Sequence, residues 1–376
     1  NAVKRRKRIL SALLALAMAL SLAACGTNAE GTAAQDPEAV SQESHAAVSE
    51  EETQEAKEEQ PSSAGTESAE ETVYPVTVTD QAGREVTIEE EPQKLVSGYY
   101  ISTSLLIALG LEEDLAGIEA KADTRPIYEL SAPQLLSLPS VGSAKEFDLE
   151  GCAALEPDLV ILPLKLQSAA ETLEGLDIDV LLINPEDQEL LGESIGLIGT
   201  ATNTMDRAQA LLDFSRGQEE RLERALAGAE RPSVYLAGNS DFLSTAGDAM
   251  YQSDLIRLAG GENAAAGIED AYWAEVSYEQ VLAWNPDYIL LASDASYTVE
   301  DVLADPNLAG VAAVENGNVH RMPGDAEAWD SPVPGGILGA VWYSCILHPE
   351  ACPEAEGEAA IREFYETFYG FSYGEN

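Results

Sequence analysis

The sequence predicts an α/β protein made of two Rossmann-like lobes with central, mostly parallel sheets, joined by one long rigid helix. A repeated unit is the first observation: Phe147–Pro163 (FDLEGCAALEPDLVILP) and Trp273–Ser293 (WAEVSYEQVLAWNPDYILLAS) share the order amphipathic segment, Pro-Asp pair and aliphatic run. Proline ends a helix, and short aliphatic runs are typical of strands buried on both faces. A helical pattern of apolar residues from about Leu190 to Ala229 lies between the two copies and is the candidate strut.

We place the first lobe at residues 74–190. It opens with a β-hairpin over Val76–Ile88, whose turn is centred on Asp80–Gly83. Polar segments at Ser97–Ser104 and Lys121–Tyr128 are expected to be loops. The remaining strands and helices alternate, which predicts a parallel sheet covered on both faces. These elements are strands at Lys94–Val96, Leu115–Glu119, Leu159–Leu162 and Val180–Ile183, and helices at Leu105–Leu109 and Ala169–Leu173.

The connecting helix is assigned to residues 191–231, where Arg231-Pro232 ends the helical pattern, and the second lobe to residues 232–376. Ile361, Phe364 and Phe368 share one face of the last predicted helix, which should therefore pack back as a closing element. The second lobe is expected to contain strands at Ser233–Ala237, Tyr288–Leu291 and Val319–Met322, and helices at Ser253–Ala259, Val299–Leu303, Ile337–Leu347 and Ala359–Phe368.

The N-terminal residues 1–24 have the pattern of a secretory signal peptide. A basic block, Lys4–Arg8, precedes the apolar run Ile9–Leu22, which is too short for a typical spanning helix. Leu22-Ala23-Ala24-Cys25 resembles the bacterial lipobox, which implies that Cys25 carries the lipid that holds the protein to the membrane. The alternative is an uncleaved membrane anchor with an incidental cysteine. Residues 25–73, rich in Glu, Ala and Ser, are expected to be a disordered acidic tether or a merely tolerated insert.

The formal net charge of −47 excludes whole classes of partner. So acidic a chain repels nucleic-acid phosphates and anionic lipid head groups. We therefore expect no nucleic acid as a partner, and membrane attachment only through the N-terminal lipid.

Several stretches together resemble one known family, the substrate-binding lipoproteins of ABC importers for iron–siderophore, haem and cobalamin. They are the hairpin, the first strand, the two Glu…Pro-Asp units, the long helical segment, Trp329 with His348-Pro349, and the terminal Phe364–Gly370 (FYETFYG). The resemblance spans about residues 74–373. It implies a ligand cleft between the lobes, a small closing angle, a monomer, and a permease dimer as the partner.

Two residues carry over as permease-docking positions. The resemblance places them at Glu150, in Asp148-Leu149-Glu150, and at Glu279, in Val276-Ser277-Tyr278-Glu279. One surface carboxylate per lobe, bound to guanidinium groups of the permease, would fix the docking geometry. The alternative is that each glutamate only favours its own helix N-terminus through the helix dipole.

In this architecture the ligand lies against loops at the strand ends that face the cleft. Cations are scarce in the chain, so those on cleft loops are candidates for binding the carboxylates of a ferric chelate or of haem, while aromatic residues would pack on its apolar body. Each cation is equally well explained as a solvated surface residue, and each tryptophan as a packing residue. The candidates are Tyr99, Tyr100, Lys121, Arg125, Tyr128, Lys165, Asn239, Phe242, Trp273, Trp329 and Asp330.

The histidine count argues against a carrier of bare Zn²⁺ or Mn²⁺. Only His45, His320 and His348 are present, whereas such a carrier needs several histidines converging with carboxylates. We therefore predict no metal site built from protein ligands and no resident cofactor. Haem ligation by Tyr99, Tyr100 or Tyr128 stays open. Cys152 is expected in the core, and Cys345 and Cys352 are either a disulfide or free thiols.

The favoured function is a membrane-tethered receptor that captures an iron chelate, haem or a corrinoid for an ABC importer. A second hypothesis is a surface lipoprotein of the same fold with a structural or adhesion role. A third is an extracytoplasmic enzyme that uses Asp330 or Asp241 with a cleft cation. The chain lacks a phosphate loop, a Gly-x-Ser-x-Gly elbow and a dinucleotide fingerprint, so nothing positive favours the enzyme.

Overall fold

The computed structural model describes residues 71–268 and 273–374. The expected signal peptide, Cys25 and nearly all of the expected tether lie outside these residues. Within the described ranges, no helix is both long and apolar enough to cross a membrane.

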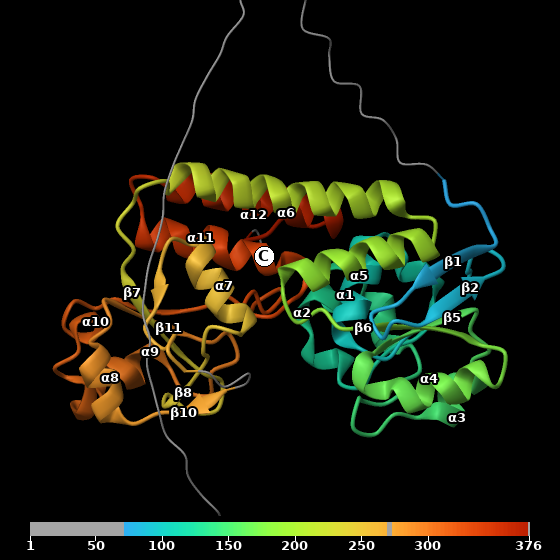
Figure 1. The fold of residues 1–376 in the computed structure, drawn as a ribbon, viewed down its shortest axis with the longest axis horizontal. Coiled ribbons are helices and arrows are strands. Elements are labelled where there is room, and N and C mark those ends of the chain that lie inside the picture. Colours follow the sequence, from blue (N-terminus) through green and yellow to red (C-terminus); the bar gives the residue numbers. More distant parts are fainter. Residues whose placement is uncertain (1–70, 269–272, 375–376) are drawn as a thin grey trace, which may run out of the picture. The chain divides into compact units, whose positions relative to one another are not determined.

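The first lobe contains a four-stranded parallel sheet in the order β4-β3-β5-β6. The antiparallel hairpin β1-β2 precedes it in the chain (Figure 1). This confirms the predicted hairpin and the predicted strands. The strands are β1 (Val76–Thr79), β2 (Glu85–Ile88), β3 (Leu95–Ser97), β4 (Leu115–Gly117), β5 (Leu159–Pro163) and β6 (Asp179–Ile183). The helices are α1 (Tyr100–Ala108), α2 (Pro126–Ser131), α3 (Leu149–Ala154), α4 (Gln167–Glu174) and α5 (Gln188–Ala201).

The second lobe repeats this topology. Its parallel sheet has the order β12-β11-β7-β9, so in both sheets the first strand lies between the second and the third, and the fourth is at the edge. The strands are β7 (Ser233–Ala237), β8 (Ser244–Thr245), β9 (Glu262–Asn263), β10 (Ala274–Glu275), β11 (Tyr288–Leu291) and β12 (Val319–Arg321). The helices are α7 (Tyr251–Leu258), α8 (Tyr278–Trp284), α9 (Val299–Ala304), α10 (Ala312–Glu315), α11 (Ile337–Leu347) and α12 (Glu354–Phe368).

Both faces of each sheet are buried, as the continuous aliphatic runs predict. In β5, Leu159 and Ile161 point into one hydrophobic cluster, and Val160 and Leu162 point into another. Side chains alternate along a strand, so a strand covered on both faces has to be apolar at every position. The first of these clusters is continuous from the N-terminal lobe to α7, α11 and α12, and it is the main core of the described chain.

The predicted single helix over 190–229 is two helices. Helix α5 ends at Ala201, and α6 (Met205–Ala225) begins after a turn in which Asn203 has a left-handed φ of 57°. The hydroxyl of Thr202 bonds the carbonyl of Ile198 at 2.7 Å and pairs with Thr204 at 2.9 Å, so the short polar side chains compete with the helix at this point.

Only α6 therefore connects the lobes. Near its start Arg207 donates to the carbonyl of Ala108 in α1, and beyond its end Leu226 packs against Gly260 after α7. Helix α6 also runs alongside α12, where the rings of Phe214 and Phe364 are 5.3 Å apart (Figure 1).

Two predicted loops contain helices. Helix α1 begins at Tyr100 rather than at Leu105, because Ser102 and Thr103 bury their hydroxyls against the carbonyl of Tyr99 and do not face water. The expected loop Lys121–Tyr128 contains a 3₁₀ turn over Ala122–Thr124 and the start of α2, where Pro126 occupies the first helical position. Helix α12 begins five residues before its predicted start, at Glu354.

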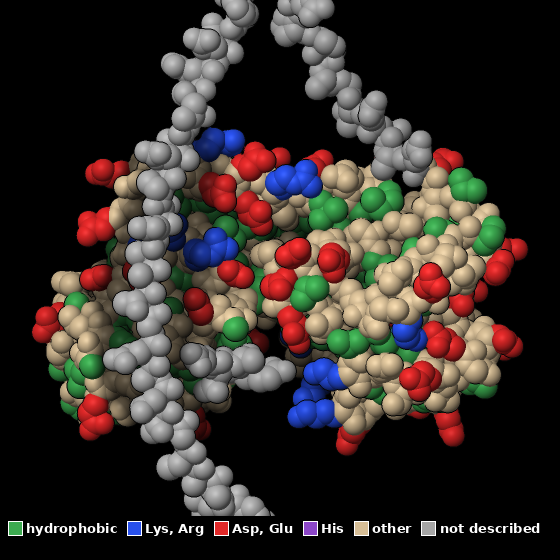
Figure 2. Space-filling view, viewed as in Figure 1, with side chains coloured by type: hydrophobic (Ala, Val, Ile, Leu, Met, Phe, Trp, Pro, Cys, Tyr) green, Lys and Arg blue, Asp and Glu red, His purple; other side chains and the backbone are tan. Residues whose placement is uncertain are grey.

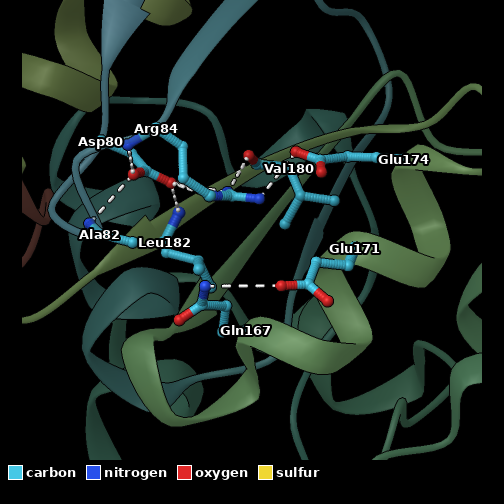
Figure 3. A network of polar contacts seen from close by, with 8 residues as sticks. All are labelled: Asp80, Ala82, Arg84, Gln167, Glu171, Glu174, Val180 and Leu182. Atoms are coloured by element: carbon cyan, nitrogen blue, oxygen red, sulfur yellow. Dashed lines mark hydrogen bonds and ion pairs between the residues drawn. The ribbon is translucent and has the colours of Figure 1, made fainter.

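The turn of the hairpin contains a buried ion pair whose two residues also bond the rest of the first lobe (Figure 3). Asp80, whose side chain is fully buried, bonds Arg84 at 2.6 Å and accepts from the backbone N–H of Leu182 at 3.0 Å. Arg84 also donates to Glu174 and to the carbonyl of Val180. Both groups of the pair are thus hydrogen-bonded on several sides, which is the condition under which a buried pair is tolerated.

Candidate functional site

A cleft of about 440 Å³ lies between loops of the two lobes. It is formed at the carboxyl ends of parallel strands, the usual position of ligand sites in α/β folds. The N-terminal lobe contributes the segments that follow β3 and β4, and the C-terminal lobe those that follow β11 and β12. The lining residues are Tyr100, Ser104, Lys121, Thr124, Arg125, Pro126 and Ile127 on one side, and Asp294, Gly324, Ala326, Glu327, Ala328 and Val333 on the other.

Two cations lie in the cleft without a salt-bridge partner among the described residues. The guanidinium carbon of Arg125 lies 4.1 Å from the centre of the Tyr100 ring. Lys121 is exposed, and its own backbone is left-handed, with φ 65°. Neither side chain forms an ion pair or a hydrogen bond in the part of the chain that the structure describes. Acidic side chains are spread over the visible face in Figure 2, whereas basic ones gather at a few places. These two cations are therefore the groups of the cleft that are available to bind negative charge, although Asp294 and Glu327 also line it.

A buried polar network is centred on Glu119, near enough to Arg125 for the two charges to interact. Glu119 accepts hydrogen bonds from Thr103 at 2.6 Å and from Tyr128 at 2.7 Å. Burial raises the pKa of Glu119, and these bonds together with the Arg125 charge offset part of the increase. Burial also raises the pKa of Tyr100, which the Arg125 charge opposes, so Tyr100 stays a neutral phenol beneath the guanidinium.

The opposite wall contains a buried carboxyl group, Glu327. Its side chain is 5% exposed, and its Oε1 accepts from the hydroxyl of Tyr369 at 3.0 Å. Its Oε2 is buried without a hydrogen-bond partner among the described residues. Burial raises the pKa of Glu327 to about 7, which the bond from Tyr369 partly opposes. The carboxyl group can therefore gain or lose a proton near neutral pH.

Of the residues predicted from the sequence for the N-terminal lobe, the structure brings Tyr100, Lys121 and Arg125 together in the cleft. Tyr99 lies next to them, with its ring 5.2 Å from that of Tyr100. Tyr128 is fully buried with its hydroxyl on Glu119, so it supports the cleft without lining it. Lys165 is exposed just after β5 and does not line the cleft.

The residues predicted for the C-terminal lobe do not converge on the cleft. Trp329 is 1% exposed and donates its indole N–H to Tyr365, so its position fits the packing alternative. Asp330 is buried, and its two oxygens accept from the backbone N–H and the hydroxyl of Ser293. Phe242 packs in the core of this lobe against Tyr235.

Two further residues of this lobe lie outside the cleft lining. Asn239 is exposed after β7. Trp273 is 37% exposed, packs against Gly238, and adjoins residues 269–272, which lie outside the described chain.

Glu150 and Glu279 occupy matching places in the two lobes. Each is exposed in the first turn of the helix, α3 or α8, that precedes the third strand of its sheet. The preceding residues Asp148 and Ser277 cap these helices by accepting from the backbone N–H of Gly151 and Gln280. The helix starts are thus already capped by other side chains, which leaves both glutamates facing solvent.

The sequence did not single out Glu327, Asp294 or Tyr369. Glu327 stands in the acidic stretch Asp325–Asp330, where nothing in the pattern distinguishes a buried carboxyl from solvated ones. Only the packing of α12 against this loop makes it distinct.

The described residues contain no group of three or more His, Cys, Asp or Glu that could hold a metal ion. Cys345 and Cys352 are free thiols in the structure, and Cys152 is a free thiol in the core, as its helical position predicted.

Comparison with known proteins identifies the family. The molybdate-binding protein MolA of Haemophilus influenzae is 26% identical over 323 residues, which cover 79% of this chain and 91% of MolA. The vitamin B12-binding protein of Pectobacterium carotovorum is 26% identical over 205 residues, covering 53% of this chain and 71% of that protein.

A periplasmic solute-binding protein from Veillonella parvula has a similar solved structure. It is 26% identical with a TM-score of 0.71, over 80% of this chain and 94% of that one. The model of the periplasmic binding protein family matches residues 95–326, well over half of the chain. The chain therefore belongs to the periplasmic binding proteins.

Proposed function

We propose that the chain is the extracytoplasmic, lipid-anchored substrate-binding protein of an ABC importer. It captures an iron complex (a ferric siderophore or haem) or a corrinoid and delivers it to the permease dimer. The observation that carries this proposal is the cleft at the strand ends, where Lys121 and Arg125 form no salt bridge with any other described residue. The negatively charged oxygens of a chelate or of haem propionates would supply the missing partners.

Tyr100 fits the same class of ligand. It lines the cleft with its ring centre 4.1 Å from the guanidinium carbon of Arg125, and there it can pack on a flat apolar surface or provide a phenol oxygen to haem iron. Of the three tyrosines that haem could use, Tyr100 is the one in the cleft lining. Tyr128 is buried with its hydroxyl on Glu119, and Tyr99 packs beside Tyr100 outside the lining.

A second candidate is a simple oxyanion. One relative, which covers 79% of this chain, is named for molybdate. A cleft of about 440 Å³ lined by two cations that form no salt bridge among the described residues suits a compact divalent anion. A corrinoid is larger than this volume and would have to project from the cleft.

A ligand panel separates these candidates. The full chain, purified in detergent, is titrated by tryptophan fluorescence with haem, cobalamin, cobinamide, ferric siderophores and molybdate. We expect saturable one-to-one binding by one class. Absence of binding by every ligand of the panel would refute the proposed function. Binding of molybdate alone would show that the ligand is an oxyanion and not an iron complex or a corrinoid.

The two cleft cations provide the matched test. Arg125→Ala and Lys121→Ala should each weaken binding about tenfold to a hundredfold, the usual value of a charge-assisted hydrogen bond. Lys145→Ala removes an exposed lysine of the same lobe outside the cleft lining and should bind as the wild type does. If all three variants bind the ligand with the same affinity, Arg125 and Lys121 do not take part in binding it.

The lipid anchor has its own test. Cells that express the chain and grow on radiolabelled fatty acid should label the wild type, whereas Cys25→Ser should be unlabelled and released from the membrane fraction. A labelled Cys25→Ser protein would contradict lipidation at this residue.

A further inference from the structure

Three tyrosines at the C-terminus contact one wall of the cleft at regular intervals. Tyr373 donates to Asp325 at 2.6 Å, Tyr369 donates to Glu327 at 3.0 Å, and Tyr365 accepts from the indole N–H of Trp329 at 2.8 Å. Tyr365 lies in the last turn of α12, Tyr369 is the residue that ends the helix, and Tyr373 follows in the C-terminal turn. Their partners on the wall are Trp329, Glu327 and Asp325, so the two segments run past each other in opposite directions. We call these contacts the tyrosine ladder.

The wall needs this support because its backbone has few hydrogen bonds of its own. The segment from Pro323 to Val333 forms neither helix nor strand, and its internal backbone bonds include one at 3.5 Å from Trp329 to Pro323. Segments with few backbone hydrogen bonds open at low free-energy cost unless side chains hold them. The rings of Tyr365 and Tyr373 stack with centroids 5.2 Å apart, and Tyr373 also packs on Trp329 at 5.5 Å, so the ladder holds the wall by packing as well.

The middle contact of the ladder reaches the other lobe. The hydroxyl of Tyr369 lies 3.2 Å from the carbonyl oxygen of Ser104 in α1, and Ser104 also lines the cleft. A hydroxyl has one hydrogen, so Tyr369 can donate to Glu327 or to Ser104 but not to both. A protonated Glu327 can donate to the Tyr369 oxygen, which frees the Tyr369 hydrogen for Ser104. An ionised Glu327 can only accept, and it then withdraws that hydrogen from Ser104.

We propose that Tyr365, Tyr369 and Tyr373 are positioning residues of the ligand cleft, and that the proton on Glu327 decides whether Tyr369 ties the cleft wall to the N-terminal lobe. This rests on the proposed function, in which the cleft binds the ligand. It adds a dependence of the cleft on pH and on the C-terminal segment.

The neighbours of Glu327 leave it as the group that titrates. Tyr365 and Tyr369 from the C-terminal segment and Tyr251 from α7 face it, and burial raises the pKa of all three above their usual value. These phenols stay neutral across the physiological range. The other charged groups of the cleft are Lys121 and Arg125 on the opposite side and Asp294 on the same side.

Hydrogen–deuterium exchange of the unliganded full chain tests the proposal between about pH 5.5 and 8.5, after correction for the intrinsic exchange rate. In the wild type, protection of peptides covering 323–334 and 100–108 should fall as the pH rises through about 7. Glu327→Gln should remove this step. Tyr369→Phe should lower protection of the wall about fivefold, the usual value of one hydrogen bond.

Tyr369→Phe has a second consequence that a merely structural role would not produce. The bond from Tyr369 lowers the pKa of Glu327, so its loss should move the protonation midpoint to higher pH, as seen in the infrared band of the protonated carboxyl. Tyr278→Phe is the matched control, because its hydroxyl also bonds a carboxylate, Asp305 at 2.8 Å, away from the cleft lining.

The proposal is overturned if the pH step persists in Glu327→Gln, or if Tyr369→Phe and Tyr373→Phe protect the wall as the wild type does. Tyr373→Phe covers the case in which Tyr369→Phe does not fold, since Tyr373 is only partly buried. The exchange experiment uses no ligand. If no ligand of the panel binds, the proposed function is refuted but the pH dependence of the cleft wall is still open to test. If the exchange experiment fails, the tyrosine ladder is refuted but ligand binding is not.

Discussion

Glu327 shows how a single carboxyl group is set by its surroundings. The side chain stands in an acidic segment, yet it is almost completely buried between α1, α12 and the cleft. Removing a carboxylate from water disfavours its charged form, and no cation compensates Glu327 within its contacts given above. Burial therefore raises the pKa of Glu327 to about 7. Glutamates on the surface keep their contact with water and do not undergo this loss of hydration.

This predicts a stability that depends on pH. The folded protein holds the Glu327 proton up to about pH 7, whereas the unfolded chain loses it near the ordinary value of 4.5, so folding binds a proton between these values. The free energy of unfolding should therefore fall as the pH rises from about 4.5 to 7.

Glu327→Gln cannot ionise and should avoid this loss, by up to about 3 kcal/mol above pH 7 and by little near pH 4. Thermal unfolding at both pH values measures it, with the exposed Glu315→Gln as the control. A variant that gains equally at both pH values would contradict the assignment.

At the scale of elements, the ion pair in the turn of the hairpin β1-β2 holds the two residues that bond β6 and Glu174 of the first lobe. Asp80 has no exposed surface in its side chain, and Arg84 has 18%. The hairpin contributes Val78, Val86 and Ile88 to the main core, but two strands alone are marginally stable in water. Through their bonds to Leu182 and Val180 of β6, the two residues of the pair set the position of this apolar face on the first lobe.

Arg84→Ala should destabilise the protein by about 3–5 kcal/mol, because it leaves the buried Asp80 carboxylate without its cation. Arg216→Ala breaks an exposed pair with Asp213, whose side chains are 59% and 56% exposed, and should cost less than about 1 kcal/mol. Denaturant unfolding compares the two. Equal costs would mean that the hairpin does not depend on the pair.

At the scale of the whole molecule, the two lobes present equivalent surfaces. Glu150 and Glu279 lie in the first turns of α3 and α8, at the same place in two sheets with the same strand order. One helix, α6, connects the lobes, and Arg207 at its start donates to α1 and to the carbonyl of Phe368 at the end of α12. A stiff connection of this kind would keep the two carboxylates at a constant separation for docking.

The double variant Glu150→Ala with Glu279→Ala should lose ligand uptake by cells while it keeps ligand binding in solution, because it removes the charges expected to dock on the permease. Glu85→Ala with Glu315→Ala removes one exposed acid from each lobe elsewhere and should transport normally. Wild-type uptake by the first double variant would refute docking through these residues and favour the helix-dipole explanation.

Local patterns were enough to predict the sheets and most helices of the fold. β5 and β11 follow from aliphatic runs after Pro-Asp, and α11 was predicted with its observed bounds, because these signals depend on the residues themselves. The break at Thr202–Thr204 was missed, since apolar spacing continues on both sides of it and only side-chain bonds to the backbone end α5.

The sequence by itself determined two parallel-sheet lobes, the acidic character of the chain and the cations and tyrosine of one cleft wall. Their type and loop position are local properties. Which residues form the other wall was decided by the tertiary structure. Trp329 was expected to face a ligand and is packed inside, whereas Glu327, two residues earlier, lines the cleft. The physical reason is that α12 folds back on this loop, and contacts between residues about forty positions apart leave no periodic signal in the sequence.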